Sequence, residues 1–336
     1  MKLQQLRYVC ETANQDMNLS KAAKKLNTSQ PAISKQIQLL EIELGVDIFL
    51  RNGKRIVQIT PPGQLIIRTA ARMLRDADNL KKIAQEFTNE VDGTLSIATT
   101  HTQARYALPP VIKRFTERYP KVKLILRQGS PLQISALVTS GEADIAIATE
   151  AIEQFQELIL LPCYQWNRCV VVPPKHPLLK IKKLTLEIIN QYPIITYDSA
   201  FTGRSKINQA FASRGLEPNV VLTALDSDVI KTYVELGLGI GILANMAFDP
   251  KRDKNLRSID ASHLFEPSTT RIGISRNSYI RGYVFDFIEM FAPHLDHASI
   301  QAKLESIQYD DLEIANSSPL KTNIQSFIEA KNEKTT

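Results

Sequence analysis

The chain has 336 residues, which is enough for two or three domains that each bury a core. Its formal charge of +6 lies entirely in residues 1–89, which hold 14 Lys and Arg against 8 Asp and Glu. This asymmetry indicates a polyanion-binding segment on a neutral body, with a merely solvated basic face as the alternative. No apolar run reaches the roughly 20 residues that span a bilayer, and the N-terminus lacks the apolar core of a signal peptide, so we expect a cytoplasmic protein without a membrane segment.

Residues 3–44 contain three short stretches with the apolar spacing of helices. The second and third, "NLSKAAKKLN" and "TSQPAISKQIQLLEIELG", are joined by a tight connection, and small Ala22 and Ala23 permit close packing, as in a helix-turn-helix. The third stretch exposes polar side chains near its N-terminal end, where they can contact base edges and phosphates in a major groove. These predicted DNA contacts are Thr28, Ser29, Gln30, Pro31, Ser34, Lys35 and Gln38.

A basic hairpin is predicted directly after these helices. The sequence "FLRNGKRIVQIT" gives two short strands around Asn52-Gly53, a dipeptide that favours a tight turn. Arg51, Lys54 and Arg55 lie at the tip and can contact phosphates or the minor groove. We therefore expect residues 1–60 to form a winged helix-turn-helix that binds DNA.

Residues 61–89 are predicted to form one long helix that begins at Thr60 and two prolines. Apolar residues recur in a heptad pattern in which large and small side chains alternate. The predicted seam consists of Ile66, Ala70, Met73, Ala77, Leu80, Ala84 and Phe87. Because alanine allows helices to approach closely, we expect an antiparallel dimer seam; packing against the protein's own first domain is the alternative.

From residue 93, strand-like runs such as "TLSIAT", "KVKLILRQ" and "ADIAIATE" alternate with amphipathic stretches. This alternation predicts an α/β body with mostly parallel strands. Runs near 158–167 and 263–271 indicate two crossings of the chain between lobes. We expect lobe I to comprise residues 93–162 and 269–295, lobe II residues 163–268, and residues 297–336 a short helix followed by a mobile tail.

Hydroxyl and amide side chains recur where predicted strands end and helices begin, as in "ATTHTQARYALP". Backbone N–H groups at helix starts bind anions, and neutral hydroxyls add hydrogen-bond donors. Together they predict a cleft between the lobes for a small anion or a polar molecule with a carboxylate. The predicted ligand contacts are Thr100, Thr102, Gln103, Gly129, Ser130, Thr149, Thr202 and Gly203. Each of these residues alone is more often a helix cap.

The stretch "NLSKAAKKLNTSQPAISKQIQLLEIELGVDIFLRNGKRIVQITPPGQ" resembles the LysR-type transcriptional regulators, and the likeness extends over about residues 1–295. It implies a winged helix-turn-helix joined by a long linker helix to a two-lobed effector domain like the periplasmic binding proteins. The stretches "ATTHTQARYALP", "LPCYQWNR", "FTGRS" and "DVIKTYVELGLGIGILANMA" are most similar to members that control sulfate assimilation and cysteine biosynthesis.

The resemblance to these members implies an acetylserine effector, N-acetylserine or O-acetylserine, in a cleft that can also hold sulfate. The ligand contacts that carry over are Thr100, Thr102, Gln103, Thr149 and Thr202. Trp166, beside the first crossing, would line the same cleft. The resemblance also implies a homodimer or homotetramer on double-stranded promoter DNA and contact with RNA polymerase. A regulator of sulfonate and sulfur-starvation genes that responds to adenosine phosphosulfate is the alternative.

Motifs for catalysis, cofactors and metals are weak in this sequence. Gly237, Gly239 and Gly241 follow a helix-like run and lack the spacing of a nucleotide loop, and His101 has no evident acidic partner nearby in the sequence. The three cysteines form no CxxC motif and resemble small buried hydrophobic residues. We therefore expect a regulator without cofactor or metal. A solute-binding receptor and an anion-using enzyme with a DNA-binding domain are the other classes considered.

Overall fold

The computed structural model describes residues 1–53, 55–86, 92–199, 202–276 and 278–304. It consists of two compact units, Met1–Val91 with Asn277–Arg281 and Asp92–Arg276 with Gly282–Thr336. Within the described residues, no helix combines the length and apolar character needed to cross a membrane.

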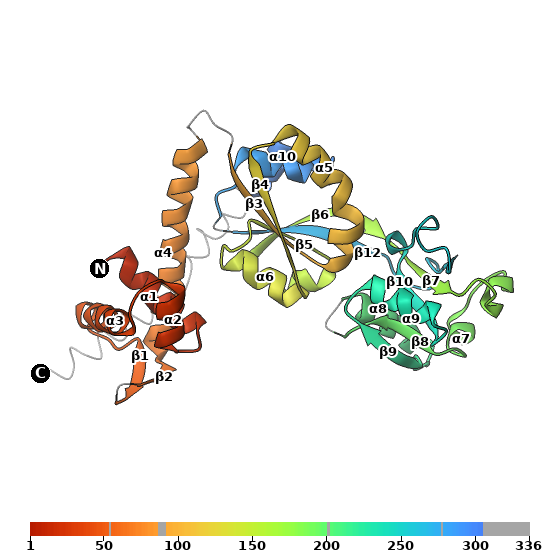
Figure 1. Cartoon of the computed structure of the whole chain (residues 1–336), viewed down its shortest axis with the longest axis horizontal. Helices are drawn as coiled ribbons and strands as arrows, with labels where there is room; N and C mark the ends of the chain where they lie inside the picture. The colour runs from red at the N-terminus through yellow and green to blue at the C-terminus, as the bar shows by residue number, and fades with distance from the viewer. Residues whose placement is uncertain (54, 87–91, 200–201, 277, 305–336) are drawn as a thin grey trace, which may run out of the picture. The chain divides into compact units, whose positions relative to one another are not determined.

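The first unit is a three-helix domain with a hairpin and a long helix (Figure 1). Its elements are α1 (Leu3–Asn14), α2 (Leu19–Lys25), α3 (Gln30–Leu44), β1 (Phe49–Asn52), β2 (Arg55–Ile59) and α4 (Pro61–Glu86). Local chemistry explains their ends: the Asn18 side chain accepts a hydrogen bond from the Lys21 N–H at the start of α2, and Gly45 at φ +69° ends α3. Leu6, Val9 and Ile33 lie in the buried core that these helices share.

Lobe I of the second unit is a five-stranded sheet in the order β4-β3-β5-β12-β6. Its elements are β3 (Gly93–Thr99), η1 (Gln103–Ala107), α5 (Leu108–Arg118), β4 (Val122–Gln128), α6 (Pro131–Thr139), β5 (Ile145–Ala148), η2 (Glu150–Gln154), β6 (Leu158–Trp166), β12 (Ser268–Ser275) and α10 (Gly282–Phe291). Helix α6 covers one face, and α5 packs with α10 on the other through Phe115 and Phe287 (Figure 1). Residues 297–304 are helical, and the rest of the predicted tail, 305–336, lies outside the described residues.

Lobe II is a second five-stranded sheet in the order β11-β7-β10-β8-β9. Its elements are β7 (Arg168–Val172), η3 (Pro177–Lys180), α7 (Leu186–Ile189), β8 (Ile194–Tyr197), α8 (Thr202–Ala212), β9 (Val220–Ala224), α9 (Ser227–Glu235), β10 (Ile240–Ala244), η4 (Asn245–Ala247) and β11 (Arg257–Asp260). Alternate residues of β7 face opposite layers, because Val170 belongs to the cluster that includes α8 residues and Val171 to the cluster that includes α9 residues.

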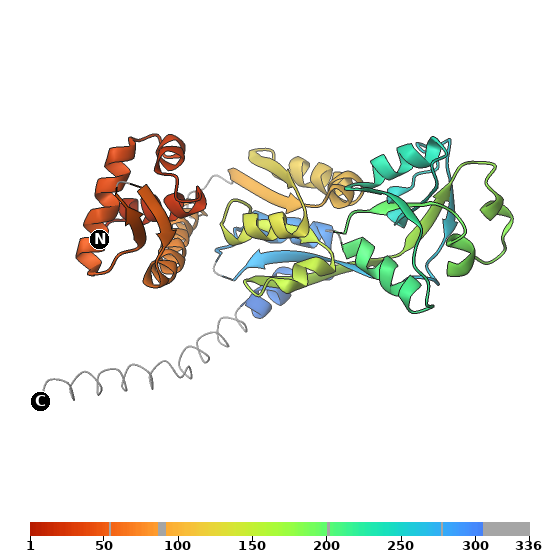
Figure 2. The same cartoon turned by 90° about the horizontal axis from the view of Figure 1, so that it is seen from below.

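The chain crosses between the lobes twice, from β6 to β7 and from β11 to β12, as Figures 1 and 2 show. Strand β6 pairs with β12 from Leu158 to Trp166, so this whole strand belongs to lobe I. The lobe boundary therefore falls at Asn167 rather than between residues 162 and 163. Among the described residues of the two lobes, only half of the strand pairs are parallel, because the strands next to the crossings run antiparallel to their neighbours. The prediction of mostly parallel strands is corrected accordingly.

Candidate functional site

Helix α3 presents the predicted DNA contacts on its outward side. Ile33, Ile37 and Leu40 form its buried stripe, and Ser29 caps its start by accepting a hydrogen bond from the Ala32 N–H at 3.4 Å. The half-buried or exposed residues at the start and opposite side are Thr28, Ser29, Gln30, Pro31, Ser34, Lys35 and Gln38. A spacing of four residues places Gln30, Ser34 and Gln38 on one face, as a helix lying in a major groove requires.

The hairpin β1–β2 lies beside this helix. Asn52 pairs with Arg55 across the turn, and Gly53 has a φ of +61°, which glycine adopts without strain. A groove of about 560 Å³ has Ser20, Gln30, Asn52 and Arg55 in its wall. The helix start and the basic hairpin therefore share one polar surface. Lys54 lies outside the described residues.

Arg51 has a structural partner instead of a free guanidinium. Its Nη2 lies 2.7 Å from Oε2 of Glu41, and the two side chains are 20% and 5% exposed. The other oxygen of Glu41 accepts hydrogen bonds from the N–H groups of Ile48 (2.9 Å) and Phe49 (3.1 Å). Arg51 thus neutralises a buried carboxylate that holds the start of the hairpin, and its contact with DNA stays a prediction.

The predicted dimer seam on α4 divides into two parts. Ala70 is 2% exposed in the core of the protein's own first domain, and Ile66 and Met73 pack partly against the same core. Further along the helix, Ala77 is half-buried, Ala84 is exposed and Leu80 is 68% exposed. The first part therefore follows the alternative of packing against the protein's own domain, and only the second part leaves apolar surface for another chain. Phe87 lies outside the described residues.

In lobe I, the carboxyl ends of β4, β3 and β5 meet at one edge, because these neighbouring strands are parallel. Thr100 follows β3 and Thr149 follows β5, and both are half-buried. The connection from β3 leads to β4 on one side, while β5 lies on the other. Such a reversal in strand order is where open α/β sheets bind ligands. The structure therefore brings Thr100 and Thr149 to a position suited to a ligand.

Gly129 and Ser130, after β4, reach the same edge but serve the start of α6. The Ser130 hydroxyl accepts a hydrogen bond from the Gln133 N–H at 3.4 Å, and the Ser130 N–H donates to Gln133 Oε1 at 2.9 Å. A Cβ on Gly129 would lie 3.0 Å from the same oxygen. These contacts match the helix-cap alternative. The side chain of Thr149, by contrast, makes no cap hydrogen bond.

Gln103 lies in η1, a single π-helical turn, and is 1% exposed. Its Nε2 donates to Thr270 Oγ1 at 3.0 Å, and its Oε1 accepts from the Tyr164 hydroxyl at 2.5 Å. The side chain therefore bridges η1 to β6 and β12, and a ligand could reach it only in exchange for these partners. The sequence pattern did not reveal this structural role.

Thr102 of lobe I lies close to Tyr197 of β8 in lobe II. The Tyr197 hydroxyl lies 2.8 Å from Ser227 Oγ and accepts a hydrogen bond from the Ala244 N–H at 3.1 Å. Burial raises the pKa of Tyr197, so this hydroxyl stays protonated. Sequence reasoning missed Ser227, although it follows β9 at a helix start, the same pattern that singled out the other hydroxyls.

Two further predicted contacts come from lobe II and from the crossing. Thr202 and Gly203 begin α8, after the carboxyl end of β8, and their side-chain positions lie outside the described part of the chain. Trp166 ends β6 and packs against an apolar cluster of lobe II, with the buried Arg168 guanidinium 5.2 Å from its ring centroid. Arg168 also donates hydrogen bonds to the Glu266 carbonyl (3.0 Å) and Ser268 Oγ (2.9 Å) across the second crossing. Trp166 therefore belongs to the joint between the lobes.

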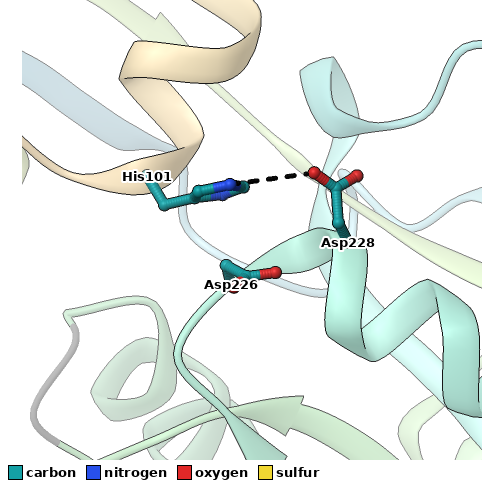
Figure 3. Close-up of side chains that lie close together, drawn as sticks. All are labelled: His101, Asp226 and Asp228. Carbon is teal, nitrogen blue, oxygen red and sulfur yellow. Dashed lines mark ion pairs between the residues drawn. The ribbon is translucent and has the colours of Figure 1, made fainter. Parts of the chain in front are cut away.

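His101 faces two carboxylates of lobe II, Asp226 and Asp228 (Figure 3). Their potential ligand atoms lie within 4.8 Å of one another, and His101 Nε2 is 3.8 Å from Asp228 Oδ2. Asp226, however, caps α9 through the Val229 N–H, and Asp228 already pairs with Lys231 (3.2 Å) and Arg105 (3.5 Å). Because these cations would repel a metal ion, the group is better described as an ion-pair cluster between the lobes.

A winged helix-turn-helix on a long helix, together with a two-lobed α/β unit that has polar strand ends, defines a ligand-responsive DNA-binding regulator. The family model described as "Bacterial regulatory helix-turn-helix protein, lysR family" matches residues 3–64. A second family model, "LysR substrate binding domain", matches residues 88–296. The chain belongs to the LysR family of transcriptional regulators, whose members bind DNA and small-molecule effectors and oligomerise. It is a regulator and not an enzyme.

Relatives and solved structures agree with this assignment. The HTH-type transcriptional regulator SsuR of Burkholderia cenocepacia is 55% identical over 304 residues, covering 90% of this chain and 99% of the relative. CysB of the same organism is 50% identical over 305 residues, covering 91% and 97%. The crystal structure of the cofactor-binding domain of the Cbl transcriptional regulator is 46% identical with a TM-score of 0.62, and it covers 65% of this chain and 96% of that domain. A full-length variant of OxyR from Pseudomonas aeruginosa has the same fold, with a TM-score of 0.64 at 23% identity over 88% of this chain and 98% of that chain.

Proposed function

We propose that this protein regulates genes of sulfate assimilation and cysteine biosynthesis in the cytoplasm, and that an acetylserine bound at the strand ends of lobe I activates it. The main support is the placement of Thr100 and Thr149 at the common carboxyl edge of β3 and β5. Similarity to regulators named CysB, SsuR and Cbl supports the sulfur-related role.

The chemistry of acetylserine fits this edge of the sheet. Its carboxylate can accept hydrogen bonds from backbone N–H groups in the helical turn that begins near His101, since the first turn of a helix has N–H groups without intrahelical partners. The hydroxyls of Thr100 and Thr149 can bond the remaining polar atoms without adding charge to the site. Sulfate, a smaller anion, can use the same N–H groups, which explains why one cleft would hold both molecules.

For DNA, we propose that α3 and Arg55 contact a promoter half-site, with a homodimer or homotetramer formed partly through the exposed section of α4. Gln30, Ser34 and Gln38 would read base edges, and Arg55 would contact a phosphate. RNA polymerase is the proposed partner of the DNA-bound protein.

Calorimetry on the full chain tests the effector. N-acetylserine, O-acetylserine, adenosine phosphosulfate and sulfate are titrated into wild type, Thr100→Val and Thr149→Val. Valine keeps the shape of threonine but removes its hydroxyl, so each variant should bind acetylserine about 5- to 150-fold more weakly. Thr116→Val, on an exposed position of α5, is the matched control and should bind like wild type.

Tightest binding of adenosine phosphosulfate would instead favour control of sulfonate and sulfur-starvation genes. Wild-type affinity in both threonine variants would show that the strand-end hydroxyls do not contact the effector.

A further inference from the structure

One buried lysine, Lys231, forms hydrogen bonds with residues of both lobes. Lys231 of α9 is 7% exposed, and its Nζ donates hydrogen bonds to the Ala247 carbonyl (3.0 Å), to Asp253 Oδ1 (3.0 Å) and to the Tyr106 hydroxyl (3.0 Å). The first two partners belong to lobe II, whereas Tyr106 belongs to η1 of lobe I. The Tyr106 hydroxyl in turn donates to Asp228, which completes a chain of charge-assisted hydrogen bonds.

The charges of this network stabilise the arrangement in which the two lobes are in contact. Burial alone would lower the pKa of Lys231, but its hydrogen bonds with Tyr106 and Asp253 outweigh burial and raise it, so the lysine stays charged. Burial would also raise the pKa of Asp228, but hydrogen bonds from Tyr106 and Lys231 lower it. A buried ammonium is stable only while its partners surround it. Separation of the lobes would move the Tyr106 hydroxyl away from the Lys231 ammonium and the Asp228 carboxylate.

Lobe I contributes more than one residue to this contact. His101 and Arg105 lie one helical turn apart and face the same oxygen of Asp228. His101 Nε2 is 3.8 Å and Arg105 Nε is 3.5 Å from Asp228 Oδ2. Tyr106 follows directly and also packs against the apolar cluster of lobe II. One short segment of lobe I therefore meets α9 by charge, hydrogen bond and apolar contact.

The same segment carries part of the proposed effector site. Thr102 precedes the π-helical turn that contains Gln103 and Tyr106, and π-helical turns often occur at functional sites. The Gln103 side chain joins this turn to β6 and β12. Movement of the segment at Thr102 would therefore be transmitted to Tyr106.

We propose that Tyr106, Asp228 and Lys231 form a latch that holds the two lobes together and pre-orders the effector site. The coupling to effector rests on the proposed function, whereas the latch itself does not. An effector that binds while the lobes are latched meets a Thr100–Thr102 segment that is already ordered, so loss of the latch adds the cost of ordering the lobes to binding.

The test uses the full chain with Tyr106→Phe, Asp228→Asn and the double variant. Tyr192→Phe is the matched control, because Tyr192 is half-buried and packs within the other cluster of lobe II. Hydrogen exchange without ligand should speed up at η1 and α9 in both single variants and stay at the wild-type rate in the control. The double variant should exchange little faster than the singles, because both changes break one network. N-acetylserine affinity should fall about 5- to 150-fold.

Wild-type exchange at both segments in the single variants would overturn the latch. Faster exchange with unchanged N-acetylserine affinity would overturn its coupling to the site. Faster exchange in a protein whose wild type binds none of the four effector candidates would leave the latch established and the proposed effector refuted.

Discussion

The DNA-binding unit and the two-lobed unit differ in how far apart their functional contacts lie in the sequence. In the first unit, the Glu41 carboxylate accepts a hydrogen bond from the N–H of Ile48, seven residues further along the chain. In the second, Gln103 bonds Thr270 across 167 residues and Lys231 bonds Tyr106 across 125. The residues that form the proposed DNA-binding surface of the first unit, from Ser20 to Arg55, therefore lie close together in the sequence. The proposed effector surface of the second unit forms only when distant strands and helices meet.

The largest expected effect separates the two parts of α4. Ala70→Glu places a carboxylate in the core of the first unit and should destabilise that unit by about 3–5 kcal/mol, because the charge has no buried partner. Leu80→Glu changes a side chain that is 68% exposed, so it should shift thermal unfolding far less than Ala70→Glu does. If Leu80 joins two chains, its loss should weaken self-association roughly 10- to 150-fold.

Thermal melts and analytical ultracentrifugation of both variants measure these outcomes. Unaltered sedimentation of Leu80→Glu would place the interface away from this part of α4, and a wild-type melt for Ala70→Glu would contradict the burial of that position.

A smaller difference in stability is expected between variants of two arginines in the hairpin, Arg51 and Arg55. Arg51→Ala leaves the buried Glu41 carboxylate without its cation and should cost about 1.5–3 kcal/mol of stability. Arg55→Ala should change stability by less than about 0.5 kcal/mol. It should instead weaken DNA binding to all sequences and reduce the salt dependence by about one phosphate contact. Melts and DNA titrations at several salt concentrations distinguish the two arginines. Equal loss of salt dependence in both variants, with no loss of stability, would favour Arg51 as a DNA contact over its structural role.

The same contrast explains what the sequence could and could not predict. The helices of the first unit and the Asn52-Gly53 hairpin follow from caps, a first-turn proline and a turn dipeptide, all within a few residues. The strand-end position of Thr100 and Thr149 follows from the β/α alternation. The partners of Arg51 and Gln103, by contrast, depend on tertiary packing, which no local pattern encodes. His101 is paired with Asp228 for the same reason, although no acid near it in the sequence offered a partner.

The last prediction uses three thiols, one in each part of the molecule: Cys10 in the first unit, Cys163 in lobe I and Cys169 in lobe II. Burial raises the pKa of Cys10 and Cys169 to about 11 and that of Cys163 to about 12, from an ordinary value of 9.0. Since the thiolate is the reactive form, labelling in the folded protein should be roughly 100- to 1000-fold slower than in the unfolded chain at the same pH.

Because these pKa values are higher in the folded state than in the unfolded state, the stability contributed by the protonated thiols is complete below pH 9 and is lost as the pH rises towards 11–12.

Variants with a single cysteine, the other two replaced by alanine, allow each part to be followed separately with a thiol reagent in increasing denaturant. If the first unit is organised by local contacts and opens by itself, Cys10 should become reactive at a different denaturant concentration from the other two. Cys163 and Cys169 should become reactive together, because contacts such as that of Arg168 with Ser268 join the two lobes. Separate transitions for these two thiols would show that the lobes unfold independently, and a single transition for all three would remove the contrast between the units.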